Sequence, residues 1–235
     1  MRNLIATSLL LAGMSTAAAA DYVENRDLDA NIDDGDTLMI VAGAGTLDVV
    51  GVDGTDKVTV KATIVIPDSS EAKGKKIIAE DLTLDLEQSG DTVTLTSKFD
   101  SSFWSGSSGR VDLEVRAPRG VNVTIDDGSG SMDVAGFQAD VKIDDGSGSI
   151  DVRDVGNLEV NDGSGSIDVD GVAGDVYIDD GSGGITVDGV GGTVRIDDGS
   201  GSIRVTDVAK DLILLDDGSG SFKYSDVRGT VSGDI

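Results

Sequence analysis

The chain has 235 residues, with 44 acidic against 18 basic side chains, 33 glycines, and neither histidine nor cysteine. Without imidazoles and thiols, the usual zinc, haem and iron–sulfur sites and any imidazole base or thiol nucleophile are excluded. A formal net charge of −26 repels phosphate backbones and anionic lipid, so nucleic-acid binding and electrostatic membrane binding are disfavoured. The hydrophobic share of 38% still allows a buried core.

Residues 1–20 have the composition of a secretory signal peptide. Arg2 supplies the positive start, an apolar run follows over 4–13, and three alanines at 18–20 offer a cleavage site before Asp21. The apolar run is shorter than the ~20 residues that span a bilayer. The sequence therefore predicts an exported protein, periplasmic or extracellular, with no membrane span after cleavage.

Residues 21–120 are predicted to form an N-terminal β cap that contains degenerate coils. Ser69 or Ser70 is a candidate N-cap for a short helix within 68–80. The other expected elements are a degenerate coil at 46–52, alternating strands at 56–66, 82–86, 92–97 and 111–115, and a hairpin turn at 89–91.

Residues 121–235 repeat one motif six times. Asp-Asp-Gly-Ser-Gly, once as Asn-Asp-Gly-Ser-Gly, recurs at steps of 18, 17, 18, 18 and 19 residues, starting at Asp126, Asp144, Asn161, Asp179, Asp197 and Asp216. A fixed period of this length is typical of a solenoid.

Aligned on this motif, the repeats place apolar residues in five rows. Rows one and two are two residues apart, as are rows three and four, which is the alternation of a strand with one buried face. The rows are Val123/Val141/Leu158/Val176/Val194/Ile213, Ile125/Ile143/Val160/Ile178/Ile196/Leu215, Met132/Ile150/Ile167/Ile185/Ile203/Phe222, Val134/Val152/Val169/Val187/Val205/Tyr224 and Phe137/Val155/Val172/Val190/Val208/Val227. All length variation then falls between the fifth row and the next first row. The fold predicted is all-β, a parallel β-solenoid (β-helix or β-roll) of ~18-residue coils.

Two stretches, GAGTLDVVGVDGTDKVTV at 43–60 and RVDLEVRAPRGVNVTI at 110–125, precede the Gly-Ser-Gly repeats. Together with these repeats they resemble the bacterial putative-adhesin, β-strand-repeat family of unknown function, over nearly the whole chain that follows residue 20. The resemblance implies an extracytoplasmic β-solenoid at the cell surface.

The paired aspartates at each corner carry the strongest chemical signal. In one interpretation they accept hydrogen bonds from the amides of the turn and form a structural ladder. In the other they bind a divalent cation such as Ca²⁺, as in a calcium-dependent β-roll, and the candidate ligands are Asp127, Asp145, Asp162, Asp180, Asp198 and Asp217. We favour the ladder, because the aspartates precede the glycines here, whereas they follow them in the calcium-binding β-roll motif.

Other functional classes have weaker support. An active site breaks a repeat at one place, and no coil carries a unique cluster of an acid, a base and an aromatic residue, so no enzyme activity and no cofactor are predicted. Phe103 and Trp104, near Phe99 in a loop of small polar residues, are candidates for partner binding or for covering the cap. The sequence predicts an acidic, non-catalytic, structural or adhesion-type protein that binds an unidentified surface or protein, with the calcium-binding β-roll as the alternative.

Overall fold

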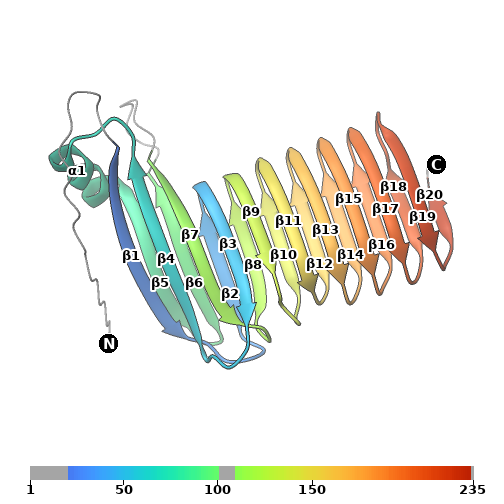
Figure 1. Cartoon of the computed structure of the whole chain (residues 1–235), viewed down its shortest axis with the longest axis horizontal. Helices are drawn as coiled ribbons and strands as arrows, with labels where there is room; N and C mark the ends of the chain where they lie inside the picture. The colour runs from blue at the N-terminus through green and yellow to red at the C-terminus, as the bar shows by residue number, and fades with distance from the viewer. Residues whose placement is uncertain (1–20, 101–108, 234–235) are drawn as a thin grey trace.

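Two β-sheets of ten strands each face one another in the computed structural model, which describes residues 21–100 and 109–233 (Figure 1). Sheet A contains, in spatial order, β1 (Tyr22–Asn31), β4 (Lys57–Ile66), β7 (Arg110–Pro118), β3 (Ala44–Val52), β9 (Ser129–Ala135), β11 (Gly148–Val155), β13 (Gly165–Val172), β15 (Gly183–Val190), β17 (Gly201–Val208) and β19 (Ser221–Val227). Sheet B contains β20 (Val231–Gly233), β18 (Leu212–Asp216), β16 (Val194–Asp198), β14 (Val176–Asp180), β12 (Leu158–Asp162), β10 (Val141–Asp145), β8 (Asn122–Asp127), β2 (Thr37–Ala42), β6 (Thr92–Phe99) and β5 (Leu82–Ser89). The predicted signal peptide lies outside the described residues.

Each repeat forms one coil with a strand in each sheet, which confirms the predicted solenoid. The six coils run from β8–β9 to β18–β19, and each strand pairs in parallel with the equivalent strand of the next coil. Rows one and two lie on sheet B and rows three and four on sheet A, facing each other across a narrow core. Ile167 and Ile185 at the middle of the stack are fully buried.

The last coil corrects the predicted rows. Leu212 and Leu214, not Ile213 and Leu215, pair with Val194 and the next inward residue of β16. Leu214 is 1% exposed and Leu215 is 46% exposed. The register then shifts by one residue before Asp216, so the extra residue of this repeat is a bulge at the end of β18 rather than a longer corner.

Tyr224, expected in the buried fourth row, is 49% exposed. It pairs with Val205 and so occupies the predicted register. β19 is, however, the terminal strand of sheet A among the described residues, so one side of the Tyr224 ring lacks a neighbouring coil. The ring packs instead against Phe222, with centroids 5.4 Å apart.

The segment before the repeats is threaded out of chain order. β2 and β3 form a coil that pairs directly with β8 and β9 of the first repeat, and β6 and β7 pair with the far side of that coil. β1, β4 and β5 complete the end of the stack with antiparallel pairing. The predicted degenerate coil at 46–52 is thus β3, and it lies inside the same two sheets as the repeats.

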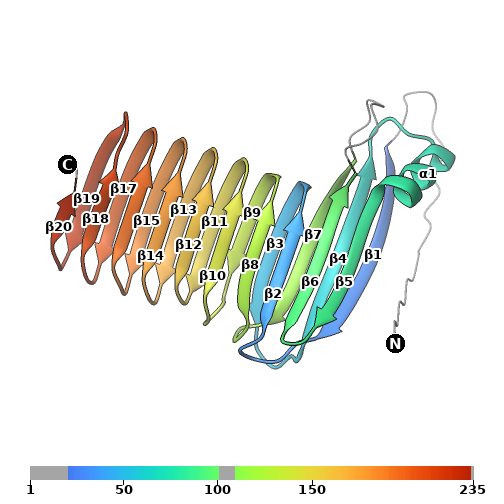
Figure 2. The same cartoon turned by 180° about the vertical axis from the view of Figure 1, so that it is seen from behind.

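The predicted helix is α1 (Glu71–Asp81). Ser70 is its N-cap, and the Ser70 hydroxyl accepts a hydrogen bond from the backbone N–H of Lys73 at 3.4 Å. α1 contacts β1 and β5 at the end of the stack, as Figures 1 and 2 show. Ile78 is buried there, and Gly74 lies against the ring of Tyr22.

One corner of the solenoid takes a left-handed backbone conformation in every coil. The residue two positions after the fourth apolar row has a φ between 49° and 83° in all six coils. These residues are Gly136, Asp154, Gly171, Gly189, Asp207 and Asp226. Glycine and aspartate tolerate this conformation better than most residues. Several of the chain's many aspartates are therefore explained by backbone geometry.

Another corner carries a ladder between coils. The Asn157 side-chain oxygen accepts from the Asp175 backbone N–H at 2.9 Å, and the Asp175 carboxylate accepts from the Thr193 N–H at 2.7 Å. The Asp211 carboxylate accepts from the Thr230 N–H at 2.8 Å. These side chains join one coil to the next, so the aspartates at this corner also have a structural role.

Candidate functional site

Five of the six predicted metal ligands form one buried column inside the solenoid. The inward–outward alternation of sheet B continues past the apolar rows, so Ile125 points inward, Asp126 outward and Asp127 inward. We call the residues that occupy this inward position in successive coils the aspartate column; they are Asp127, Asp145, Asp162, Asp180 and Asp198, between 0% and 6% exposed. Each lies directly opposite the next in the parallel register. The sixth, Asp217, follows the bulge in the last coil and is half-buried.

In three of the five column carboxylates, one oxygen is held by the turn that follows it. Oδ1 of Asp162, Asp180 and Asp198 accepts from the backbone N–H of the serine two residues later, at 3.0 to 3.1 Å. This is the contact that the structural interpretation of the sequence predicts. The glycine N–H of the same turn bonds to the backbone carbonyl of the column aspartate in the preceding coil, for example Gly181 to Asp162 at 2.9 Å.

The second oxygen is buried without a protein donor. This holds for Oδ1 of Asp145 and for Oδ2 of Asp162, Asp180 and Asp198. A buried acceptor without a partner costs stability. Asp127 differs because it lines a small hollow with Ala42, Val111 and Leu113.

Burial shifts the titration of the whole column. Loss of solvation raises the pKa of all five carboxyls, and the negative charge of Asp145 and Asp126 adds to the rise for Asp127. The pKa of Asp127 and of Asp180 reaches about 6. The turn amides act in the opposite direction, since a hydrogen bond to the carboxylate lowers its pKa.

The column does not gather ligands around one point. Within residues 21–100 and 109–233, no three or more acidic side chains are placed to hold a metal ion together. The described carboxylates follow one another along the stack, about 4.8 Å apart at the spacing of neighbouring strands. Ca²⁺ prefers six to eight oxygen ligands, whereas the turn groups that contact Asp162, Asp180 and Asp198 are N–H donors.

The outer face of sheet A carries an acidic row that the sequence analysis did not single out. Asp133, Asp151 and Asp168 occupy one outward position in three successive coils. Two further carboxylates, Asp48 of β3 and Glu114 of β7, continue this row without a gap. We call these five residues the acidic row. Asp48 and Glu114 could not be assigned to this row from the sequence, because the out-of-order threading of β3 and β7 leaves no trace in the repeat pattern.

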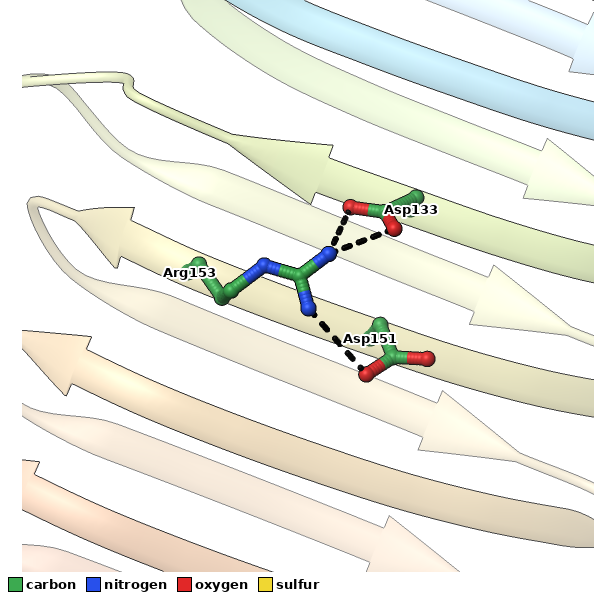
Figure 3. Close-up of polar contacts among 3 residues, drawn as sticks. All are labelled: Asp133, Asp151 and Arg153. Carbon is green, nitrogen blue, oxygen red and sulfur yellow. Dashed lines mark hydrogen bonds and ion pairs between the residues drawn. The ribbon is translucent and has the colours of Figure 1, made fainter.

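Arg153 offsets part of this charge. Its guanidinium donates to the Asp133 carboxylate at 2.6 Å and approaches Asp151 at 3.5 Å, so one cation lies between two members of the acidic row (Figure 3). Glu114 and Asp168 at the two ends of the row, and Asp48 beside Glu114, are exposed. Past Asp168 the same position holds Thr186, Arg204 and Lys223. This outward position of sheet A therefore changes from acidic to basic towards the last coil.

A hollow of about 460 Å³ lies beside the acidic row where β1, β4 and β7 meet. Its charged lining is balanced, with three acids and three bases, namely Asp27, Asp29, Glu114, Lys57, Lys61 and Arg116. Lys57 is paired with Asp29 at 2.9 Å. This balance contrasts with the net negative charge of the chain.

The predicted partner-binding residues Phe103 and Trp104 lie outside the described residues. Their neighbour Phe99 is partly buried against the core, and its ring lies beside Ile66 near Gly109. The part of the chain that the structure describes contains no helix long and apolar enough to cross a membrane.

No family model and no curated protein matches this sequence. Several solved structures resemble this chain over most of their own length, at low sequence identity. A putative adhesin from Bacteroides fragilis is 12% identical, with 89% of this chain and 97% of that chain covered and a TM-score of 0.41. A putative cell adhesion protein from Clostridium sporogenes is 12% identical over 89% and 98% of the two chains, with a TM-score of 0.29. A putative lipid binding protein from Parabacteroides distasonis is 12% identical over 89% and 94%, with a TM-score of 0.33. Likeness at this level transfers no function to this chain, and the descriptions of the first two match the family that the sequence resembles.

Proposed function

We propose that the protein is exported and acts as a non-catalytic, adhesion-type binding protein that presents the outer face of sheet A to a basic surface or protein. The observation that carries this proposal is the acidic row, with five carboxylates in direct register on five neighbouring strands. Their spacing is set by the strand separation of ~4.8 Å. A partner with regularly spaced cations can contact the exposed Asp48, Glu114 and Asp168 and compete with Arg153 for the other two carboxylates.

The acidic row has a cost that folding alone does not explain. Like charges directly opposite one another on a sheet are destabilising. Outward aspartates also lie in register on sheet B, but Asn161 interrupts that row. In the acidic row five carboxylates follow one another without interruption, and Asp48, Glu114 and Asp168 point from exposed strand positions. A binding role accounts for carboxylates held in such a place.

Export and the lack of catalysis rest on separate grounds. The composition of residues 1–20 supports export. The carboxylates recur from coil to coil, and this repetition favours a binding surface over a single catalytic centre. The calcium-binding β-roll is the alternative function; the unpaired column oxygens support it, and their linear arrangement counts against it.

The first prediction tests the acidic row with an extended oligolysine peptide as the probe. Replacing Asp133, Asp151 and Asp168 together by Asn is expected to weaken peptide binding at least tenfold at low salt, measured by calorimetry. The matched control replaces Asp144, Asp179 and Asp197, outward residues of sheet B, by Asn. This control removes the same charge and is expected to bind nearly as the unchanged protein does. Equal losses in the two triple variants would mean that only net charge matters, and would reject the proposed face.

A further inference from the structure

We propose that the aspartate column binds protons between neighbouring coils, so that mild acid joins the coils through carboxyl-to-carboxylate hydrogen bonds and stabilises the solenoid. The proton is the ligand, and it is supplied by the solvent. This inference concerns the interior of the solenoid and is independent of what the outer face of sheet A binds.

The first support is the placement of the carboxyls. Asp145, Asp162, Asp180 and Asp198 lie opposite one another in consecutive parallel strands, at a separation close to ~4.8 Å between backbones. Side chains stacked at this spacing are near enough for one carboxyl to reach the next. The column is therefore a continuous line of groups that can share protons.

The second support is the set of unpaired oxygens. Each of these four carboxyls has one buried oxygen without a protein donor, while Oδ1 of Asp162, Asp180 and Asp198 is already held by a turn amide. A carboxylate can only accept, but a protonated carboxyl gains an O–H donor. Protonation of one member lets it donate to its neighbour, which satisfies two buried groups at once.

The third support comes from the charges around the column. Burial and like charges raise the pKa of the column carboxyls, to about 6 for Asp127 and Asp180. Within the described residues, the one cation that acts on the column is Lys98, which lies 4.0 Å from the outward Asp126 and only weakly lowers the pKa of Asp127. The other charged groups that act on the column are acidic; they are the outward aspartates Asp126, Asp144, Asp179, Asp197 and Asp216 together with Asp217. From sheet A, Asp127 is faced by the apolar Val111 and Leu113.

The choice of residue points the same way. The outward position beside the column has Asn161 in one coil, so an amide is accepted there. The inward position is aspartate in all six repeats. An asparagine would also accept the turn N–H, so the turn alone does not require a carboxyl at every step.

The direction of the pH effect follows from linkage. A carboxyl with a raised pKa in the folded state binds its proton more tightly when folded than when unfolded. Its contribution to stability is complete below about pH 4 and is lost as the pH rises through about 6. From pH 8 to pH 5, one such group raises the folded-to-unfolded ratio about tenfold.

The experiment follows urea unfolding of the full chain between pH 5 and 8, comparing the Asp180→Asn variant with Asp179→Asn. Asp180 is in the column, and Asp179 is its exposed neighbour with the same charge. We expect the folded-to-unfolded ratio of the unchanged protein to rise as the pH falls from 8 to 5. In Asp180→Asn this rise should be about tenfold smaller, and the variant should be more stable than the unchanged protein at pH 8. Asp179→Asn should keep the full rise. Equal pH profiles for the two variants would overturn the proposal.

A direct measurement covers the case in which Asp180→Asn does not fold. Infrared spectra of the unchanged protein are expected to show protonated carboxyl groups at pH 5.5, well above the ordinary aspartate pKa of about 4. A matching signal should be absent from the urea-unfolded chain at the same pH. If the folded chain has no protonated carboxyl at pH 5.5, the column does not bind protons.

Discussion

Single glycines set how closely the coils stack at the corner after the aspartate column. Gly148 and Gly165 have φ values of 152° and 156°, and each faces the equivalent glycine of the neighbouring coil. A Cβ on Gly165 would overlap the backbone carbonyl of Gly148. Because the obstacle is backbone, it cannot rotate away as a side chain could.

The second prediction is that Gly165→Ala destabilises the protein by roughly 3 kcal/mol, through steric overlap and an unfavourable φ. Gly184→Ala is the control, since its nearest neighbour is the Ser202 hydroxyl at 3.9 Å and its φ is not in the left-handed region. Urea midpoints give the comparison. Similar midpoints for the two variants would show that the coils can separate at this corner without loss.

At the scale of the element, β18 shows what determines the buried face of a strand whose sequence does not alternate apolar and polar residues. Four apolar residues, 212–215, follow one another, so either pair can enter the core. The structure buries Leu212 and Leu214 and places the irregularity at the end of the strand, next to Asp216. The pairing with β16 therefore sets the register, because stacking on Val194 and Ile196 fills the core row.

The third prediction separates the two possible registers of β18. Leu214→Ala is expected to cost ~2–4 kcal/mol, because it leaves a cavity in a narrow core. Leu215→Ala should change stability by less than ~0.5 kcal/mol, as exposed substitutions usually do. Denaturant midpoints measure both changes. The reverse order of effects would restore the register expected from the sequence.

The repeats were predictable from sequence because their strands, except β18, alternate inward apolar residues with outward ones, and because each strand has six aligned copies. Ile150, Ile167 and Ile185 fall in one buried row whichever copy is used for the alignment. The register of β18 was not predictable, because Ile213 and Leu215 are as apolar as the residues that are buried. The acidic row was predictable only for Asp133, Asp151 and Asp168, since the pairing of Asp48 with Glu114 depends on contacts between segments distant in sequence.

The aspartate column was predicted as a set of residues but not with its orientation. The sequence treated both aspartates of each pair as corner residues. The structure places Asp180 inside and Asp179 outside because strand alternation continues through the pair. An aspartate in a buried strand position contradicts the usual preference of the residue, so hydrophobic patterning alone could not reveal it.

At the scale of the whole molecule, the charge of −26 makes stability depend on whatever screens it. The fourth prediction is that the chain folds without metal and that Ca²⁺ and Mg²⁺ at equal concentration raise the melting temperature alike and by little. Turn amides already hold one oxygen of the column carboxylates. Exposed charges are screened over ~8–10 Å by any salt. Scanning calorimetry in chelator and in each cation makes the comparison.

A chain that is unfolded in chelator and folds at sub-millimolar Ca²⁺, but not Mg²⁺, would contradict this expectation. Such a result would require a site with a measurable affinity for one ion, because stabilisation by binding depends on the ratio of concentration to dissociation constant. It would favour the calcium-binding β-roll over the structural interpretation of the column. Sodium chloride at matched ionic strength is the control for screening.

The out-of-order threading of β2 and β3 sets a direction for folding. Neighbouring repeats pair residues about 18 apart, such as Val123 with Val141, whereas Thr37 pairs with Asn122, about 85 residues away. Closing the longer loop costs roughly 1.4 kcal/mol more in chain entropy. The short loops of the repeats favour early formation of the coils after residue 121, which then offer β8 and β9 as a finished edge for β2 and β3. We therefore expect the coils after residue 121 to form before β2 and β3 join them, against the direction in which the chain is synthesised.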